Sequence, residues 1–339
     1  MVTTKQYNIM TSCDDVLAPY IAVNLTAIAH NLSDSHIDFF LLHSRVSQEN
    51  LDMLDALSQK YKNITFHEVR VPNPEVYEAL AELGGGWTGE AYYSACAHLL
   101  LPQDIDRVLY LDAADTLIVG DIEPYYSYDF QDKALVVTAF QYRWKNNKLE
   151  LFETEDLGDW EGQLLCILRG FFNSGSYMMN LKKMRKDGLT LTDYIVLAQE
   201  LYKIFDGKED LAAKLYEHLD RRENALYFGD EGLLSAAFVG NVRYYGFPQI
   251  QDVWYMPYNF CIWYYNRKKE KPAYVPSILH FTGTAFKPWE GNYPIFLKRF
   301  QKKEKLHLME ELKLGQAGYF YQWHEYAVIA DQVLSEIDR

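Results

Sequence analysis

Apolar runs and segments of helical periodicity alternate along roughly the first seventy residues of the chain. Short runs rich in β-branched and aromatic residues predict three strands, at residues 7–11, 37–42 and 64–69. Apolar residues at helical spacing predict two helices between these strands, at residues 19–32 and 48–60, the second with Ser47 as its N-cap. Strands and helices that alternate in this way predict an α/β fold with a mainly parallel sheet.

Residues 72–88 break the alternation, because Pro72, Pro74 and three consecutive glycines fall within one short stretch. This composition predicts an irregular loop, either over a site or as a solvated connection. Thr88 is then expected to cap a helix at residues 89–101.

The same criteria predict the later elements. Strands are expected at residues 108–112, 134–138, 171–181 (a turn of small residues that leads into a strand), 242–245 and 277–281. Helices are expected over most of residues 182–222, with breaks at Gly188 and Gly207, and from Gly229 onward. Residues 144–160 are polar and acidic, and we expect them to leave the core.

One apolar run, at residues 107–111, leads directly into Asp112 and Asp115 and then resumes as a second apolar run. The two carboxylates therefore lie where a buried strand reaches the surface, which is where α/β proteins bind ligands. Two carboxylates in a half-desolvated place repel each other, and a divalent cation between them and a phosphate removes the repulsion. We favour a metal site over the alternative, a polar turn in which Asp115 caps the following segment.

The segment Asp-Ala-Ala-Asp-Thr-Leu is also similar to the Asp-x-Asp-x-Thr nucleophile loop of haloacid-dehalogenase-like phosphatases. In those enzymes the aspartates follow the first strand and are separated by one residue. Here they follow a later strand and are separated by two, so the phosphatase interpretation ranks low.

Composition narrows the class of protein. The 339 residues are 49% hydrophobic, which is enough for one large α/β domain with a buried core. A formal net charge of -14 argues against a nucleic-acid partner, because phosphate backbones bind broad clusters of Lys and Arg. An aromatic content of 15% suits stacking on sugar rings, although most of these side chains are expected in the core.

The cysteines and the N-terminal sequence indicate the compartment. The four cysteines are far apart and form no Cys-x-x-Cys pair, so we expect buried, reduced thiols. The N-terminus shows no signal-peptide pattern, and no apolar run reaches the roughly 18 residues of a membrane-spanning helix. We therefore expect a cytoplasmic protein.

Three further candidates for chemistry lie later in the chain. His280 at a predicted strand end and Lys287 would, together with the two aspartates, suit Mn²⁺ and a diphosphate. Asp230 and Glu231 fall in the first turn of a predicted helix, where complementarity to the helix dipole, worth about 0.3–1 kcal/mol, is an alternative explanation.

Short motifs occur in a fixed order along the chain. They are Ser12-Cys13-Asp14-Asp15, Tyr110-Leu111-Asp112-Ala113-Ala114-Asp115, Phe172-Asn173-Ser174-Gly175, Gly229-Asp230-Glu231-Gly232-Leu233-Leu234, and His280-Phe281-x-Gly283 followed by Lys287-Pro288-Trp289. Through this set, about residues 7 to 290 resemble the retaining glycosyltransferases of family 8, which include bacterial lipopolysaccharide galactosyl- and glucosyltransferases and glycogenin.

The resemblance implies a GT-A fold, with a single Rossmann-like, mixed but mainly parallel sheet flanked by helices. It also implies a UDP-glucose or UDP-galactose donor, a hydroxyl acceptor on a glycan, lipopolysaccharide or glycoprotein, and a bound Mn²⁺, with Mg²⁺ as the alternative. The implied metal ligands are Asp112, Asp115 and His280. The implied nucleotide and diphosphate contacts are Ser12, Asp14, Asp112, Gly283 and Lys287. The implied residues at the donor sugar are Asn173, Asp230 and Glu231.

The chain departs from the family pattern in ways that bear on activity. Two alanines separate Asp112 from Asp115 where relatives have one residue, and Ser94 stands where relatives carry an Arg that contacts the donor. These departures keep open an alternative, a sugar-nucleotide-binding protein of the same fold that has lost transfer. Glu231 stands where relatives commonly carry Gln, and we hypothesise that its carboxylate stabilises an oxocarbenium ion.

Two parts of the chain differ in character. We expect a catalytic domain at residues 1–293 and a helical extension at residues 294–339. The extension combines a Lys- and Arg-rich stretch with an aromatic cluster at residues 319–326. We expect it to dock on the sheet, with peripheral contact to the inner face of a membrane as the second interpretation.

Overall fold

The structure is a computed structural model. It describes residues 5–85, 87–139, 142–145, 148–151, 160–219, 225–245, 260–261, 276–281, 287–289 and 316–337. Gly283 and the basic stretch of the C-terminal extension lie outside these residues.

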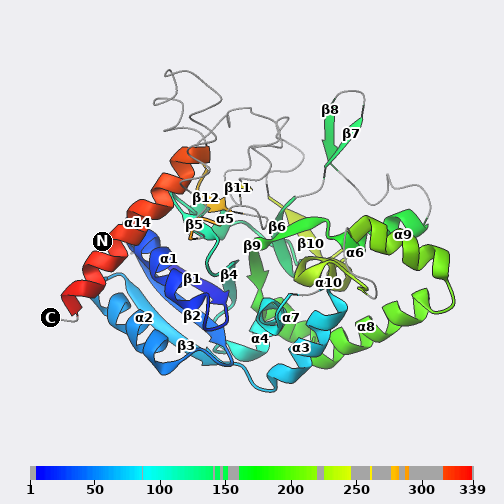
Figure 1. The fold of residues 1–339 in the computed structure, drawn as a ribbon, viewed down its shortest axis with the longest axis horizontal. Helices are drawn as coiled ribbons and strands as arrows, with labels where there is room; N and C mark the ends of the chain where they lie inside the picture. Colours follow the sequence, from blue (N-terminus) through cyan, green and yellow to red (C-terminus); the bar gives the residue numbers. More distant parts are fainter. Residues whose placement is uncertain are drawn as a thin grey trace.

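The described strands and helices follow one another as Figure 1 labels them. The strands are β1 (Lys5–Ser12), β2 (Ser35–His43), β3 (Ile64–Arg70), β4 (Arg107–Leu111), β5 (Thr116–Ile118), β6 (Leu135–Ala139), β7 (Tyr142–Lys145), β8 (Lys148–Leu151), β9 (Phe172–Asn180), β10 (Val242–Tyr244), β11 (Phe260–Cys261) and β12 (Ile278–His280). The helices are α1 (Ala18–Asn31), α2 (Gln48–Lys60), α3 (Pro74–Leu83), the 3₁₀ helix η1 (Gly89–Cys96), α4 (Ala97–Leu100), α5 (Glu123–Tyr126), α6 (Trp160–Arg169), α7 (Leu181–Asp187), α8 (Leu191–Phe205), α9 (Glu209–Leu219), α10 (Gly229–Ala237) and α14 (Gln316–Ile337).

Seven of the described strands form the main sheet, in the order β10-β6-β9-β4-β1-β2-β3. Neighbouring strands are parallel except at β9, which runs antiparallel to both β4 and β6. The predicted mixed, mainly parallel sheet flanked by helices is confirmed (Figure 1).

Because β9 runs the opposite way, it begins at the edge of the sheet where β1, β2 and β4 end. Leu111, the last residue of β4, pairs with Ser176, and the Asp112 N–H donates to the Gly175 carbonyl at 3.0 Å. The start of β9 therefore lies directly beside the acidic end of β4.

A smaller sheet completes this edge. It has the order β11-β12-β5, and β12 is antiparallel to β5, with His280 opposite Thr116. The Phe281 N–H donates to the Asp115 carbonyl at 2.7 Å. This pairing brings a late segment of the chain next to the two aspartates.

Helices cover both faces of the main sheet. On one face, α1 and α2 pack over a core that includes Ile9 and Phe39; on the other, η1, α3, α4, α7 and α8 pack over a core that includes Met10 and Phe40. Neighbouring residues such as Ile9 and Met10 lie in different cores because consecutive side chains alternate between the two faces of a strand. Both faces are apolar, as expected for strands of a doubly covered sheet.

Several local predictions are confirmed. The Ser47 side chain caps α2 by accepting a hydrogen bond from the Asn50 N–H at 3.4 Å. Gly188 and Gly207 separate α7, α8 and α9, and both have positive φ. Among the described cysteine side chains, Cys13, Cys96 and Cys166 are free thiols and buried, as predicted.

Two predictions between residues 72 and 101 are wrong. The expected irregular loop contains α3, because Pro74 stands in the first turn of that helix, where the missing N–H has no partner to lose. The expected single helix after Thr88 is η1 followed by α4, and the Thr88 side chain makes no capping hydrogen bond.

The C-terminal helix α14 packs on the core, but mainly against α1 and α2 rather than on the main sheet (Figure 1). Trp323 belongs to the same apolar cluster as Leu117 of β5 and Leu279 of β12, and the Asn31 Nδ2 donates to the Tyr326 hydroxyl at 2.6 Å. An amphipathic helix buries its apolar side against an exposed apolar surface, and here that surface belongs to α1 and α2. The boundary at residue 293 stays a prediction.

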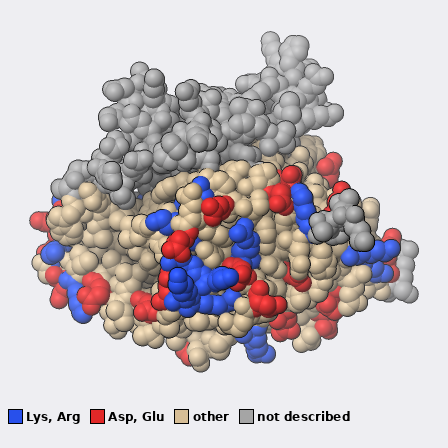
Figure 2. Space-filling view, turned by 180° about the vertical axis from the view of Figure 1, so that it is seen from behind, with Lys and Arg blue, Asp and Glu red and all other residues tan. Residues whose placement is uncertain are grey.

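The described surface carries mixed charge. Figure 2 shows Lys and Arg lying among Asp and Glu on the face opposite to that of Figure 1. Of the helices that the structure describes, none has the length and apolar character needed to cross a bilayer.

Candidate active site

Asp112 and Asp115 are held by the backbone of the turn that follows β4. The Asp112 carbonyl accepts from the Thr116 hydroxyl at 2.6 Å, and its N–H is bound to β9. Asp115 is fixed from the other side, because its carbonyl accepts from the Phe281 N–H. The turn is thus hydrogen-bonded to segments of both sheets, and its two carboxylates lie where these sheets meet.

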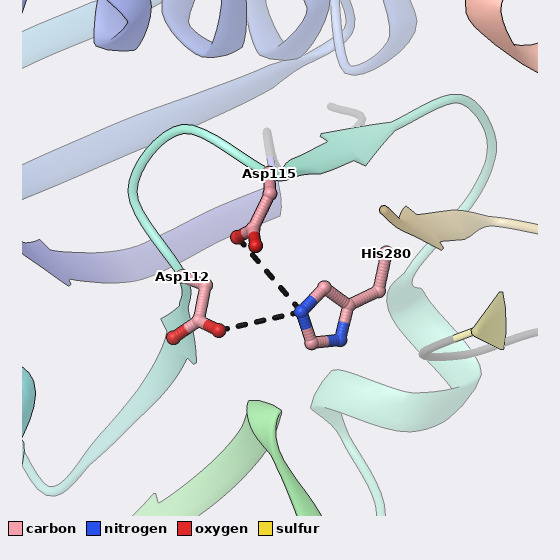
Figure 3. A group of neighbouring side chains, drawn as sticks. All are labelled: Asp112, Asp115 and His280. Atoms are coloured by element: carbon pink, nitrogen blue, oxygen red, sulfur yellow. Dashed lines mark ion pairs between the residues drawn. The ribbon is translucent and has the colours of Figure 1, made fainter. Parts of the chain in front are cut away.

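The His280 imidazole points at both carboxylates (Figure 3). Its Nε2 lies 3.3 Å from Asp112 Oδ2 and 3.8 Å from Asp115 Oδ1. One donor atom from each of the three side chains falls within 4.8 Å of the others. The structure therefore brings together the three residues that the sequence could only name separately.

This donor set fits a divalent cation. Two carboxylate oxygens and an imidazole nitrogen are ligands that Mn²⁺ accepts. The His280 side chain is 4% exposed and that of Asp112 is 32% exposed, so the cluster is buried on the protein side and open on the other. An ion held here would keep coordination positions for a ligand from solvent.

Gly175 makes room for the imidazole. A Cβ at this position would lie 2.6 Å from His280 Nε2 and closer still to other ring atoms. Any side chain at residue 175 would therefore displace the ring, which explains why glycine follows Asn173 and Ser174 at the start of β9.

Lys287 forms an ion pair with Asp115 and also donates to the Phe281 carbonyl at 3.0 Å. Burial alone would raise the pKa of Asp115, but its interactions with Lys287 first and then with His280 outweigh burial and lower that pKa. An ammonium beside the two carboxylates is suited to hold an anionic group, such as a phosphate, that approaches the same place.

Asp230 and Glu231 stand in the first turn of α10 and are both buried. Burial and then the nearby charge of Asp112 raise the pKa of Asp230 to about 7. Burial and the charge of Asp230 raise the pKa of Glu231 well above its usual range. Complementarity to a helix dipole needs no such burial, whereas groups that act at a site are often buried with shifted pKa values.

Asn173 connects Glu231 to His280. Its Nδ2 donates to Glu231 Oε2 at 3.1 Å, and its Oδ1 lies 2.8 Å from His280 Nδ1. The Ser174 N–H also donates to Glu231 Oε2, at 3.3 Å. Two of the predicted sugar-contacting residues, Asn173 and Glu231, thus form one hydrogen-bonded group with the predicted metal ligand His280.

The predicted nucleotide contacts lie at the ends of β1 and β4. The Ser12 hydroxyl is 3.4 Å from the Tyr110 hydroxyl, and Asp14 accepts from the Leu17 N–H at 2.9 Å in the turn before α1. Both residues lie at the same edge of the sheet as Asp112, whereas the placement of Gly283 is outside the described residues.

Tyr110 is a site residue that reasoning from the sequence missed. Its hydroxyl donates to Asp112 Oδ1 at 3.1 Å, which leaves Oδ2 facing His280. A signal was available, because residues two apart on a strand point to the same side and Tyr110 stands two before Asp112.

Comparisons with known proteins identify the family and the fold. Residues 4–292 match the family described as "Glycosyl transferase family 8". No curated protein sequence matches the chain significantly.

Many solved structures have a similar fold, and two of them illustrate it. The galactosyltransferase LgtC, in complex with donor and acceptor sugar analogs, superposes with a TM-score of 0.55 at 20% identity, over 87% of this chain and 94% of LgtC. The glycosyltransferase GlyE of Streptococcus pneumoniae superposes with a TM-score of 0.54 at 16% identity, over 98% of this chain and 63% of GlyE.

The fold is therefore that of the GT-A glycosyltransferases, with a site at its carboxyl edge suited to a cation and a phosphate. Since the family match spans most of the chain, the protein belongs to glycosyl transferase family 8. This membership confirms the resemblance seen in the sequence and leaves the phosphatase alternative without support.

Proposed function

We propose that the protein transfers a hexose from UDP-glucose or UDP-galactose to a hydroxyl group of a glycan, lipopolysaccharide or glycoprotein, with retention of anomeric configuration. The observation that carries the proposal is the convergence of Asp112, Asp115 and His280 beside Lys287. A nucleoside diphosphate develops negative charge as it leaves, and a cation at these residues together with Lys287 would stabilise that charge.

In this proposal, Asp112, Asp115 and His280 hold Mn²⁺, or Mg²⁺ in its place. When bound, the ion supplies Lewis-acid stabilisation of the departing diphosphate. Lys287 would give up part of its contact with Asp115 and hold a diphosphate oxygen. Ser12 and Asp14 would contact the nucleoside from the carboxyl end of β1.

The donor sugar would lie against Asn173, Asp230 and Glu231. Their burial excludes water, which protects a reactive glycosyl cation from hydrolysis. We propose that Glu231 stabilises positive charge at the anomeric carbon. Its carboxylate is bound by residues of β9 rather than by its own helix, which favours a role at the site over a helix-terminal one.

Release of UDP from a panel of UDP-sugars, with and without Mn²⁺, tests the proposal. We expect Mn²⁺-dependent release from the wild type, and a loss of at least about 100-fold in Asp112→Asn, because a direct ligand is removed. Asp106→Asn is the matched control, since Asp106 is an exposed carboxylate paired with Lys182 away from the site.

Each result has a distinct meaning. Binding of a UDP-sugar in a thermal-shift assay without any UDP release identifies the alternative, a sugar-nucleotide-binding protein. Absence of binding to every UDP-sugar refutes the donor class. Unchanged turnover in Glu231→Gln dismisses the charge-stabilising role of Glu231 but leaves the rest of the proposal intact.

A further inference from the structure

The Asn173 side chain is enclosed by groups whose hydrogen-bonding roles are fixed. A backbone N–H can only donate, and the Gly175 N–H faces Asn173 Oδ1 at 3.2 Å. Asn173 Nδ2 then faces Glu231 Oε2, which accepts from it at 3.1 Å and from the Ser174 N–H at 3.3 Å. The amide can satisfy both neighbours in one orientation only, with its oxygen toward Gly175 and His280.

This orientation determines which nitrogen of His280 carries hydrogen. An amide oxygen accepts and does not donate, so His280 Nδ1, at 2.8 Å from Asn173 Oδ1, must donate its N–H. The neutral imidazole then has its lone pair on Nε2. That nitrogen faces Asp112 Oδ2 at 3.3 Å and Asp115 Oδ1 at 3.8 Å.

A lone pair that faces two carboxylates is repelled by both unless a proton or a metal ion lies between them. Histidines that bind metals generally donate their second N–H to a fixed acceptor, which orients the ring and raises the basicity of the ligating nitrogen. Here the acceptor is an asparagine amide, and Glu231 in turn fixes that amide.

We propose that Asn173 is a positioning residue of the cation site: held by Glu231, its amide oxygen fixes His280 as the Nδ1–H tautomer with Nε2 directed at the ion. This role is additional to any contact of Asn173 with the donor sugar, and it rests on the divalent-cation site of the proposed function. It also gives Glu231 a second effect, because the carboxylate supports the metal ligand through Asn173.

The test measures Mn²⁺ binding to the full chain without donor or acceptor, by electron paramagnetic resonance of free and bound ion. In Asn173→Ala we expect the affinity to fall by about 10- to 100-fold, as outer-shell substitutions do. We also expect loss of the hyperfine coupling from a directly bound imidazole nitrogen at saturating Mn²⁺. A side chain that merely stabilised β9 would not change this coupling.

Asn180→Ala is the matched control. Asn180 lies on the same strand, and its side chain also makes two hydrogen bonds, to the Lys183 N–H and the Lys133 carbonyl, but at the opposite end from the site. We expect its Mn²⁺ affinity to stay within about twofold of the wild type, because outer-shell effects act through the ligands.

A second variant guards against poor folding of Asn173→Ala. Asn173→Asp has the size of the wild-type side chain and keeps an acceptor oxygen for both the Gly175 N–H and His280 Nδ1–H. We expect this variant to recover the nitrogen coupling and an affinity within about fivefold of the wild type.

Wild-type affinity and nitrogen coupling in Asn173→Ala would overturn the proposal. An equal loss in Asn180→Ala would overturn it as well, because the effect would then come from loosening of β9. Failure of sugar transfer would not overturn the proposal, since ion binding is measured without substrate. Normal transfer with unaltered Mn²⁺ binding in Asn173→Ala would refute only the positioning role of Asn173.

Discussion

A methyl group at residue 175 should remove His280 from the cation site. In Gly175→Ala, the new Cβ would lie 2.6 Å from His280 Nε2 and 2.6 Å or less from the neighbouring ring atoms. Ordinary contacts of a Cβ begin at 3.4 Å, so the ring has to move by close to 1 Å or more. The backbone cannot yield easily instead, because the Gly175 carbonyl is bound to the Asp112 N–H.

A shift of this size exceeds what metal coordination tolerates. Metal–ligand distances vary by about 0.2 Å, so a ring displaced by about 1 Å no longer ligates an ion held by the two aspartates. We expect Mn²⁺ affinity to fall by at least about 100-fold, more than for an outer-shell change, with a parallel loss of UDP release. Overpacking should also lower the free energy of unfolding by about 1–3 kcal/mol.

The assay is a Mn²⁺ titration of folded protein, with stability followed in parallel by urea unfolding. Gly120→Ala is the control, since a Cβ there meets the Ser277 hydroxyl at 3.3 Å, and that side chain can rotate away. Folded Gly175→Ala that binds Mn²⁺ within threefold of the wild type would show that the imidazole is not a ligand, and the geometric reasoning would be refuted.

Two further predictions concern stability. Arg185 donates to five backbone carbonyls of residues 98–105, including those of His98 at 2.7 Å and Ile105 at 2.8 Å. Arg185→Ala should therefore lower the free energy of unfolding, measured by urea titration, by about 2–4 kcal/mol. A loss of less than about 0.5 kcal/mol would contradict this prediction. Burial raises the pKa of Asp38, but hydrogen bonds from His67 and Gln6 outweigh it and lower that pKa. The carboxylate therefore stabilises the fold above its unfolded pKa of 3.8, and the advantage over Asp38→Asn should disappear as pH falls through the folded pKa. Thermal midpoints of both proteins between about pH 2 and 6 check this, and equal midpoints at every pH would count against it.

Much of the fold follows from contiguous residues. The first βαβαβ unit, the Ser47 cap and the breaks at Gly188 and Gly207 could be predicted, because periodicity, capping and backbone freedom act over a few neighbouring positions. The prediction was wrong for α3, where two prolines indicate a loop although Pro74 is compatible with a first helical turn.

The amino-acid sequence shows which groups are available: Asp112 and Asp115 at a strand end, His280 and Lys287 far along the chain, and the motifs that contain Asn173 and Glu231. Their order alone supported the family. No local pattern, however, specifies how close residues of distant segments lie to one another.

Only the three-dimensional fold brings these groups together. The antiparallel course of β9 brings Asn173 and Gly175 to the end of β4, and the pairing of β12 with β5 sets His280 opposite Thr116, next to the aspartates. The orientation of the imidazole then depends on an amide from β9 and a carboxylate from α10. Such geometry arises only from long-range packing, since directed hydrogen bonds and metal ligation depend on fractions of an ångström.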